Sequence, residues 1–70
     1  MDFREFRVAL ARKNVSNREL AAQIPLSEQA LYNKLNGVTE FKNSEIKRIA
    51  EVLSLSMEEV NTIFFDGIVN

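Results

Sequence analysis

Apolar residues recur at intervals of three and four positions along most of the chain, a spacing typical of the buried side of an α-helix. The pattern is clearest over residues 43–53, where Ile46, Ile49, Ala50 and Leu53 would line one face. The same pattern predicts helices over 3–13, 17–24 and 28–36, and a short last helix that carries Met57, Val60, Ile63 and Phe64. We therefore expect an all-α fold of five short helices.

Two capping boxes mark where helices begin. In a capping box, the hydroxyl before the helix accepts a free backbone N–H, and a glutamate three residues later reaches back to the cap. The two pairs are Ser16 with Glu19 and Ser56 with Glu59. These pairs predict that the second helix begins at residue 17 and the fifth at residue 57.

Other residues mark where the second and third helices end. Pro25 ends the second helix, because a proline ring disfavours helical geometry in the residue before it. Asn36 and Gly37 tolerate positive φ and end the third helix. A loop over residues 38–42 follows, and we expect Phe41 to anchor it in the core.

The predicted core combines the helical stripes with most of the phenylalanines. Its members are Leu20, Ala21, Leu31, Leu35, Ile46, Ile49, Leu53, Phe3, Phe6, Phe41 and Phe64. We expect a small residue at position 21 because the third helix crosses the second closely there. A chain of this size buries only about 60% of its unfolded surface, so the core must be well packed.

Composition narrows the classes of function. The 70 residues make one domain, 1–70, with 46% apolar residues, two glycines and one proline. The absence of cysteine and histidine excludes disulfides, thiolate and imidazole catalysis, and Cys/His zinc sites. We expect no enzyme activity, cofactor, metal or small-molecule substrate. No apolar run approaches the roughly 20 residues of a membrane span, and the start of the chain is too charged for a signal peptide, so we expect a cytoplasmic protein.

Charge is unevenly distributed along the chain. Residues 1–48 hold nine basic and six acidic side chains, whereas residues 49–70 hold four acidic and no basic side chains. A nucleic-acid-binding protein usually carries a basic footprint, which here is confined to the first two-thirds. The alternative explanation is that these charges belong to ordinary solvent-exposed helix faces, which carry charges of either sign.

The second and third predicted helices, joined by a very short turn, form a helix-turn-helix pattern over residues 17–36. In that motif, residues at the start of the second helix contact base edges in the major groove. The candidate base contacts are Glu28, Gln29, Tyr32 and Asn33, and Gln29 and Asn33 share a side of the helix because they are four apart. Gln and Asn can bond adenine doubly, and Glu can accept from the cytosine amino group. The candidate phosphate contacts are Asn17, Arg18, Ser27, Lys34, Asn36, Lys42 and Asn43.

The stretch VSNRELAAQIPLSEQALYNKLNG, followed by EIKRIAEVLSLSMEEV, resembles the XRE or lambda-repressor-like helix-turn-helix family of phage repressors and Cro proteins. The resemblance covers residues 6–55. It implies a compact five-helix domain and a cytoplasmic transcription regulator that binds operator DNA as a homodimer. Asn17, Glu28, Gln29 and Asn33 stand where that family contacts DNA. The ending EEVNTIFF resembles small switch regulators of temperate phages of Gram-positive bacteria.

A second function stays open on the same fold. Small helix-turn-helix proteins of phage lysis–lysogeny switches can modulate repression by binding the phage repressor instead of reading an operator alone. Such a protein needs contacts complementary to its partner more than it needs a basic face. The candidate partner-binding residues are Glu28, Gln29, Tyr32, Phe65, Ile68 and Val69, the last three from the apolar tail 64–70.

Overall fold

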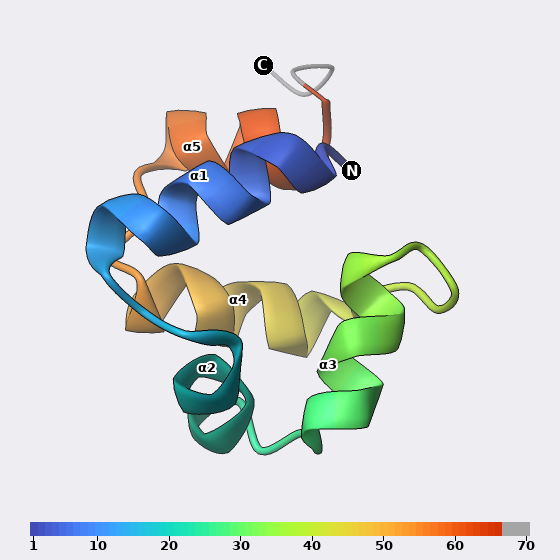
Figure 1. Cartoon of the computed structure of the whole chain (residues 1–70). Coiled ribbons are helices and arrows are strands. Elements are labelled where there is room, and N and C mark those ends of the chain that lie inside the picture. The colour runs from blue at the N-terminus through green and yellow to red at the C-terminus, as the bar shows by residue number, and fades with distance from the viewer. Residues whose placement is uncertain (67–70) are drawn as a thin grey trace.

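A computed structural model of the chain describes residues 1–66 as five α-helices without strands. The helices are α1 (Phe3–Lys13), α2 (Asn17–Gln23), α3 (Glu28–Leu35), α4 (Asn43–Val52) and α5 (Met57–Phe64). The expected all-α fold of five helices is confirmed for this part of the chain. Figure 1 shows α1 and α5 side by side at one end of the molecule, α2 and α3 at the other, and α4 between them.

Both predicted capping boxes are present. The Ser16 hydroxyl accepts from the Glu19 N–H at 3.1 Å, and the Glu19 carboxylate accepts from the Ser16 N–H at 3.1 Å. Ser56 and Glu59 repeat the exchange at the start of α5, at 3.1 and 2.9 Å. The starts of α2 and α5 are therefore fixed by local side chains, as the sequence predicts.

Three helices end one residue earlier than predicted, so that Ile24, Asn36 and Leu53 are C-cap residues. Each still donates its N–H to the carbonyl four residues back, and the chain turns away directly after it. Of the two residues expected to tolerate positive φ, only Gly37 uses it, at φ 77°, while Asn36 has φ −102°. A Cβ at Gly37 would also lie 3.4 Å from the Phe3 ring.

The core joins all five helices. Its buried apolar residues are Phe6, Ala9, Leu10, Leu20, Ala21, Ile24, Leu31, Leu35, Ile49, Leu53, Ile63 and Phe64. Phe6 stacks on Phe41 with ring centroids 5.7 Å apart and meets the edge of Phe64 at 5.7 Å. Phe41 and Phe64 pack edge to face at 5.8 Å, so the three rings link α1, the loop before α4 and α5.

Three residues predicted for the core are only half-buried. Phe3, Phe41 and Ile46 line an open hollow of about 460 Å³ beside the loop 36–42, which leaves one side of each accessible. Met57, which the apolar pattern includes in the last helix, is 83% exposed because it is the first residue of α5. The periodicity therefore identifies the helices correctly but overestimates the burial of residues at the edge of the core.

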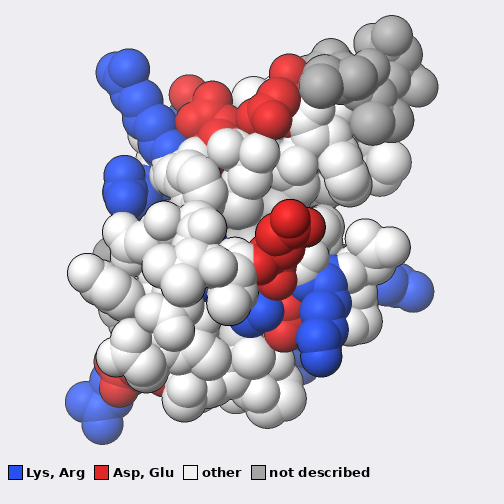
Figure 2. Space-filling view, turned by 90° about the vertical axis from the view of Figure 1, so that its right-hand side faces the viewer, with Lys and Arg blue, Asp and Glu red and all other residues white. Residues whose placement is uncertain are grey.

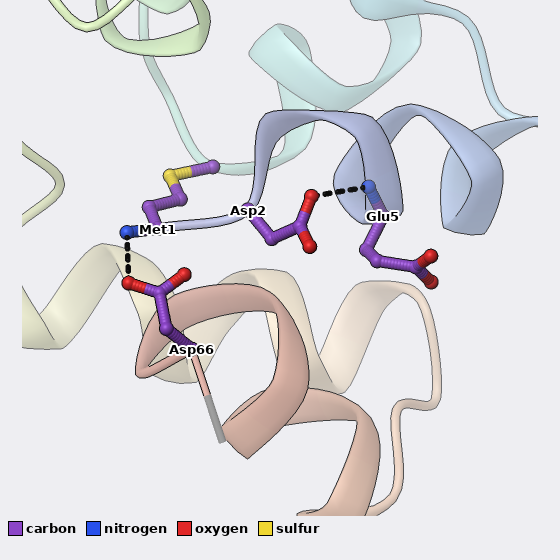
Figure 3. Close-up of polar contacts among 4 residues, drawn as sticks. All are labelled: Met1, Asp2, Glu5 and Asp66. Atoms are coloured by element: carbon purple, nitrogen blue, oxygen red, sulfur yellow. Dashed lines mark hydrogen bonds and ion pairs between the residues drawn. The ribbon is translucent and has the colours of Figure 1, made fainter. Parts of the chain in front are cut away.

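The start of α1 is tied to the end of α5 (Figure 3). The Asp2 carboxylate accepts from the Glu5 N–H at 3.0 Å and caps α1, and the Asp2 N–H donates to the Ile63 carbonyl at 2.6 Å. The Met1 ammonium lies 3.0 Å from the Asp66 carboxylate. These contacts hold α1 and α5 together as one end of the fold.

Candidate functional site

The candidate site lies on α2, the turn 24–27 and α3. The Leu26 N–H donates to the Ala21 carbonyl at 2.8 Å and folds the chain back at the end of α2. Pro25 lies in this turn, where its missing N–H leaves no helical bond unmade. The Ser27 hydroxyl then accepts from the Ala30 N–H at 3.0 Å and starts α3. Ala21 is 2% exposed at the packed side of α2, consistent with the small residue expected there.

The four predicted base-contact residues, Glu28, Gln29, Tyr32 and Asn33, form the start of α3, here termed the α3 head. Glu28, Gln29 and Tyr32 are exposed, and with Asn17 of α2 they line an open hollow of about 260 Å³. Tyr32 is 59% exposed, so its ring extends outward instead of covering the core. The fold thus brings together residues from both predicted helices on one accessible surface.

Two residues of the α3 head are joined to each other. The Gln29 Nε2 donates to the Asn33 Oδ1 at 3.1 Å, which confirms that this pair shares a side of the helix. Asn33 is half-buried, whereas Gln29 is exposed. The bond fixes the amide plane of Gln29 and leaves its Oε1 as an acceptor and its second Nε2 hydrogen as a donor.

The predicted phosphate contacts divide into engaged and unengaged residues. Within residues 1–66, the side chains of Arg18, Lys42 and Asn43 are exposed and form no ion pair or hydrogen bond. Asn36 donates its Nδ2 to the Tyr32 carbonyl at 2.7 Å, and the Ser27 hydroxyl serves as the cap of α3. Arg18 and Lys42 are therefore the two predicted cations without a direct ion pair in these residues, although the Lys42 charge acts on nearby Glu45.

Lys34 is held inside the fold. Its ammonium lies 3.2 Å from the Glu45 carboxylate, donates to the Glu40 carbonyl at 3.0 Å, and lies over the Phe41 ring. The two side chains of the pair are only 11% and 12% exposed. Lys34 could contact a phosphate only by leaving these partners, so its charge joins α3 to α4 in this structure.

The same contacts set the pKa of Glu45. Partial burial raises the pKa of Glu45. The Lys42 N–H donates to the Glu45 carboxylate at 2.7 Å, and the charges of Lys34 and Lys42 lie nearby. Together these contacts outweigh burial and bring the pKa below its usual 4.5. Because the folded pKa is the lower one, this stabilisation is present above about pH 4.5 and is lost as the pH falls through the folded value.

We expect Glu45→Gln to lower the free energy of unfolding at neutral pH by about 1 kcal/mol, the size of one charged hydrogen bond. The difference from wild type should shrink below about pH 4, where the wild-type carboxylate also becomes protonated. Urea unfolding measured over a pH series tests this. Glu28→Gln is the matched control, since that carboxylate is exposed and forms no ion pair or hydrogen bond within residues 1–66. A constant difference at all pH values would contradict the account.

The sequence did not indicate that Arg48 takes part in the site's support. Its Nε donates to the Gln23 carbonyl at 3.1 Å, so α4 satisfies one of the free carbonyls at the end of α2. The two residues are 25 positions apart, and no local spacing marks such a pair. This contact holds the end of α2, where the turn begins, against α4.

The side of the molecule that carries α3 and the loop 36–42 is not strongly basic. Figure 2 shows it as largely uncharged, with basic and acidic side chains interspersed. The basic excess of residues 1–48 is therefore not gathered on this side. Electrostatic attraction to a polyanion would come from a few separate cations.

A family model matches residues 1–67, nearly the whole chain, and is described as a protein of unknown function, DUF739. The chain belongs to the DUF739 family. No curated protein and no solved structure shows significant similarity to it. The DUF739 description assigns no activity, so the resemblance to lambda-repressor-like proteins stays a prediction. Among residues 1–66, no helix has the length and apolar character needed to cross a bilayer.

The predicted partner-binding residues do not all lie on one surface. Phe65 is the C-cap of α5 and is 39% exposed, and Figure 1 places the end of α5 away from the α3 head. Ile68 and Val69 lie outside the described residues. The α3 head and the chain end are therefore separate candidate contacts.

Proposed function

We propose that this DUF739 protein is a sequence-specific DNA-binding transcription regulator of the Cro type, in which α2 and α3 act as a helix-turn-helix. One observation carries the proposal. Polar side chains from the starts of both helices converge around one open hollow, and nothing in residues 1–66 covers it. An exposed helix start with amide and carboxylate side chains has the form required to enter the major groove.

Gln29 is the central base contact in this proposal. The bond to Asn33 holds the Gln29 amide and leaves one acceptor and one donor of that amide unused, which is the pair that adenine N6 and N7 require. Asn33 then acts as a positioning residue, because its own carbonyl oxygen is already bonded. Glu28 would accept from a cytosine amino group on a neighbouring base pair.

Phosphate contacts would come from Arg18 at the start of α2 and Lys42 at the start of α4. The neutral donors would be Asn17, Asn43, Ser27 and the second Nδ2 hydrogen of Asn36. Lys34 supports the site from within instead of contacting DNA. By resemblance to the lambda-repressor-like family, the operator would be bound by a homodimer, and the cell would be a bacterial host.

This arrangement predicts an unusually shallow salt dependence. Each phosphate neutralised by a cation contributes roughly 0.9 to the magnitude of the slope of log K against log salt. Arg18 and Lys42 together therefore give a slope of magnitude roughly 2 per protomer. Fluorescence anisotropy with labelled DNA from the gene's own upstream region, at several salt concentrations, measures it. Arg18→Ala should reduce the magnitude of this slope by roughly 1. No binding by folded protein at low salt would contradict the proposal.

A second candidate is a modulator of repression that binds a phage repressor through the α3 head. Two observations favour it: the Glu28 carboxylate is exposed without an ion-pair partner in residues 1–66, and Figure 2 shows no broad basic surface on that side. A carboxylate at this position is complementary to an Arg or Lys of a protein partner. If the DNA titration fails, the protein should be labelled and titrated with the repressor encoded beside it.

A further inference from the structure

A second surface lies at the opposite end of the molecule from the α3 head. It is a groove between α1 and α5 of about 200 Å³. Ala9 and Ile63 are buried at 4% and 3% and form its floor, and Val8, which is 39% exposed, forms part of its wall. Figure 1 shows that no other helix of the described chain covers the outer side of α1 and α5. We name this surface the α1–α5 groove.

The rim of the groove is acidic. Glu5 of α1 and Glu58 of α5 line it, and neither carboxylate forms an ion pair or side-chain hydrogen bond among residues 1–66. A third carboxylate, Glu59, lies 3.9 Å from the Arg12 guanidinium, so the single cation of the groove is already partly compensated. The lining thus carries three negative charges and one positive charge around an apolar floor.

The charge of the surrounding surface differs between the two helices. Residues 57–66 contain Glu58, Glu59 and Asp66 and no Lys or Arg, whereas α1 carries Arg4, Arg7, Arg12 and Lys13, and the Lys13 charge also acts on Glu59. An apolar floor with unpaired carboxylates on its rim is complementary to an apolar side chain flanked by Lys or Arg.

We propose that the α1–α5 groove is a docking site for a basic amphipathic segment of another protein, with one apolar side chain over Ala9 and Ile63 and cations beside Glu5 and Glu58. A second copy of the chain fits this place less well, because pairing groove to groove would bring two rims of excess negative charge together. The groove lies apart from the α3 head, so a partner bound there leaves the proposed DNA-reading surface free.

The test uses two labelled peptides with the same amphipathic helical pattern, one built from Leu and Lys and the other from Leu and Glu. Fluorescence anisotropy should show that the full chain binds the basic peptide and that the acidic peptide binds at least roughly tenfold more weakly. Glu58→Lys should weaken binding of the basic peptide by roughly tenfold, since an attractive charge becomes a repulsive one. Glu58→Gln should have a smaller effect in the same direction.

Glu51→Lys is the matched control. Glu51 is an exposed glutamate of α4 that lines neither the α1–α5 groove nor the hollow at the α3 head, so this substitution makes the same change of charge elsewhere on the surface. Glu51→Lys should leave peptide binding at the wild-type level, and circular dichroism would verify that all variants are folded. Equal binding of the two peptides, or equal effects of the two Lys variants, would overturn the proposal. So would concentration-dependent self-association abolished by Glu58→Lys, which would identify a second copy as the occupant. None of these outcomes depends on whether the chain binds DNA.

Discussion

Phe6→Ala should unfold most of the protein at physiological temperature. Phe6 is 1% exposed and contacts the rings of both Phe41 and Phe64, so its removal leaves a cavity and two unpartnered aromatic faces. Removing a buried phenylalanine costs about 3–5 kcal/mol, and aromatic pairs add about 0.5–1.5 kcal/mol each. A domain of this size has only about 4–10 kcal/mol of stability in total.

Thermal unfolding followed by far-UV circular dichroism measures this effect. The midpoint should fall by about 15 °C or more, because each kcal/mol shifts it by about 4–8 °C in so small a domain. Val38→Ala is the control, since Val38 is 70% exposed and its truncation should change stability by less than about 0.5 kcal/mol. Similar midpoints for the two variants would show that the three rings do not form the centre of the core.

The local part of the fold could be predicted from the sequence because its causes are local. Ser16 and Glu19 are three residues apart and cap α2 as expected, and Gln29 and Asn33 are four apart and bond on one helix face. Helical periodicity likewise identifies Ile49 and Leu53 as core residues. Each of these predictions depends only on the spacing within one turn of helix.

The rest depends on contacts between distant positions. Lys34 on α3 meets Glu45 on α4, which turns an expected phosphate contact into a partly buried pair, and no sequence pattern marks the two as partners. Arg48 reaches a carbonyl 25 residues away for the same reason. The half-burial of Phe3 and Phe41 follows from the hollow beside the loop 36–42, whose shape depends on how α1, α4 and α5 meet.

Gln29→Ala should give the largest loss of DNA binding among single substitutions in the α3 head. A side chain that bonds a base with two hydrogen bonds contributes about 1–3 kcal/mol of discrimination, so affinity for the specific fragment should fall by roughly 5- to 150-fold. Non-specific binding should hardly change, because Gln29 carries no charge to neutralise a phosphate. Asn33→Ala should cause a smaller loss, since it frees the Gln29 amide without removing it. Fluorescence anisotropy on the upstream fragment gives both affinities.

The most direct test of the central claim compares wild type, Gln29→Ala and Thr62→Ala on the upstream fragment and on a scrambled fragment of equal length. Thr62 is exposed on α5 at the far end of the molecule, so its truncation serves as the control. If the α3 head reads DNA, wild type and Thr62→Ala should prefer the upstream fragment, and Gln29→Ala should lose roughly 5- to 150-fold of that preference. If Gln29→Ala keeps the full preference, or if wild type has none, the α3 head is not a DNA-reading surface.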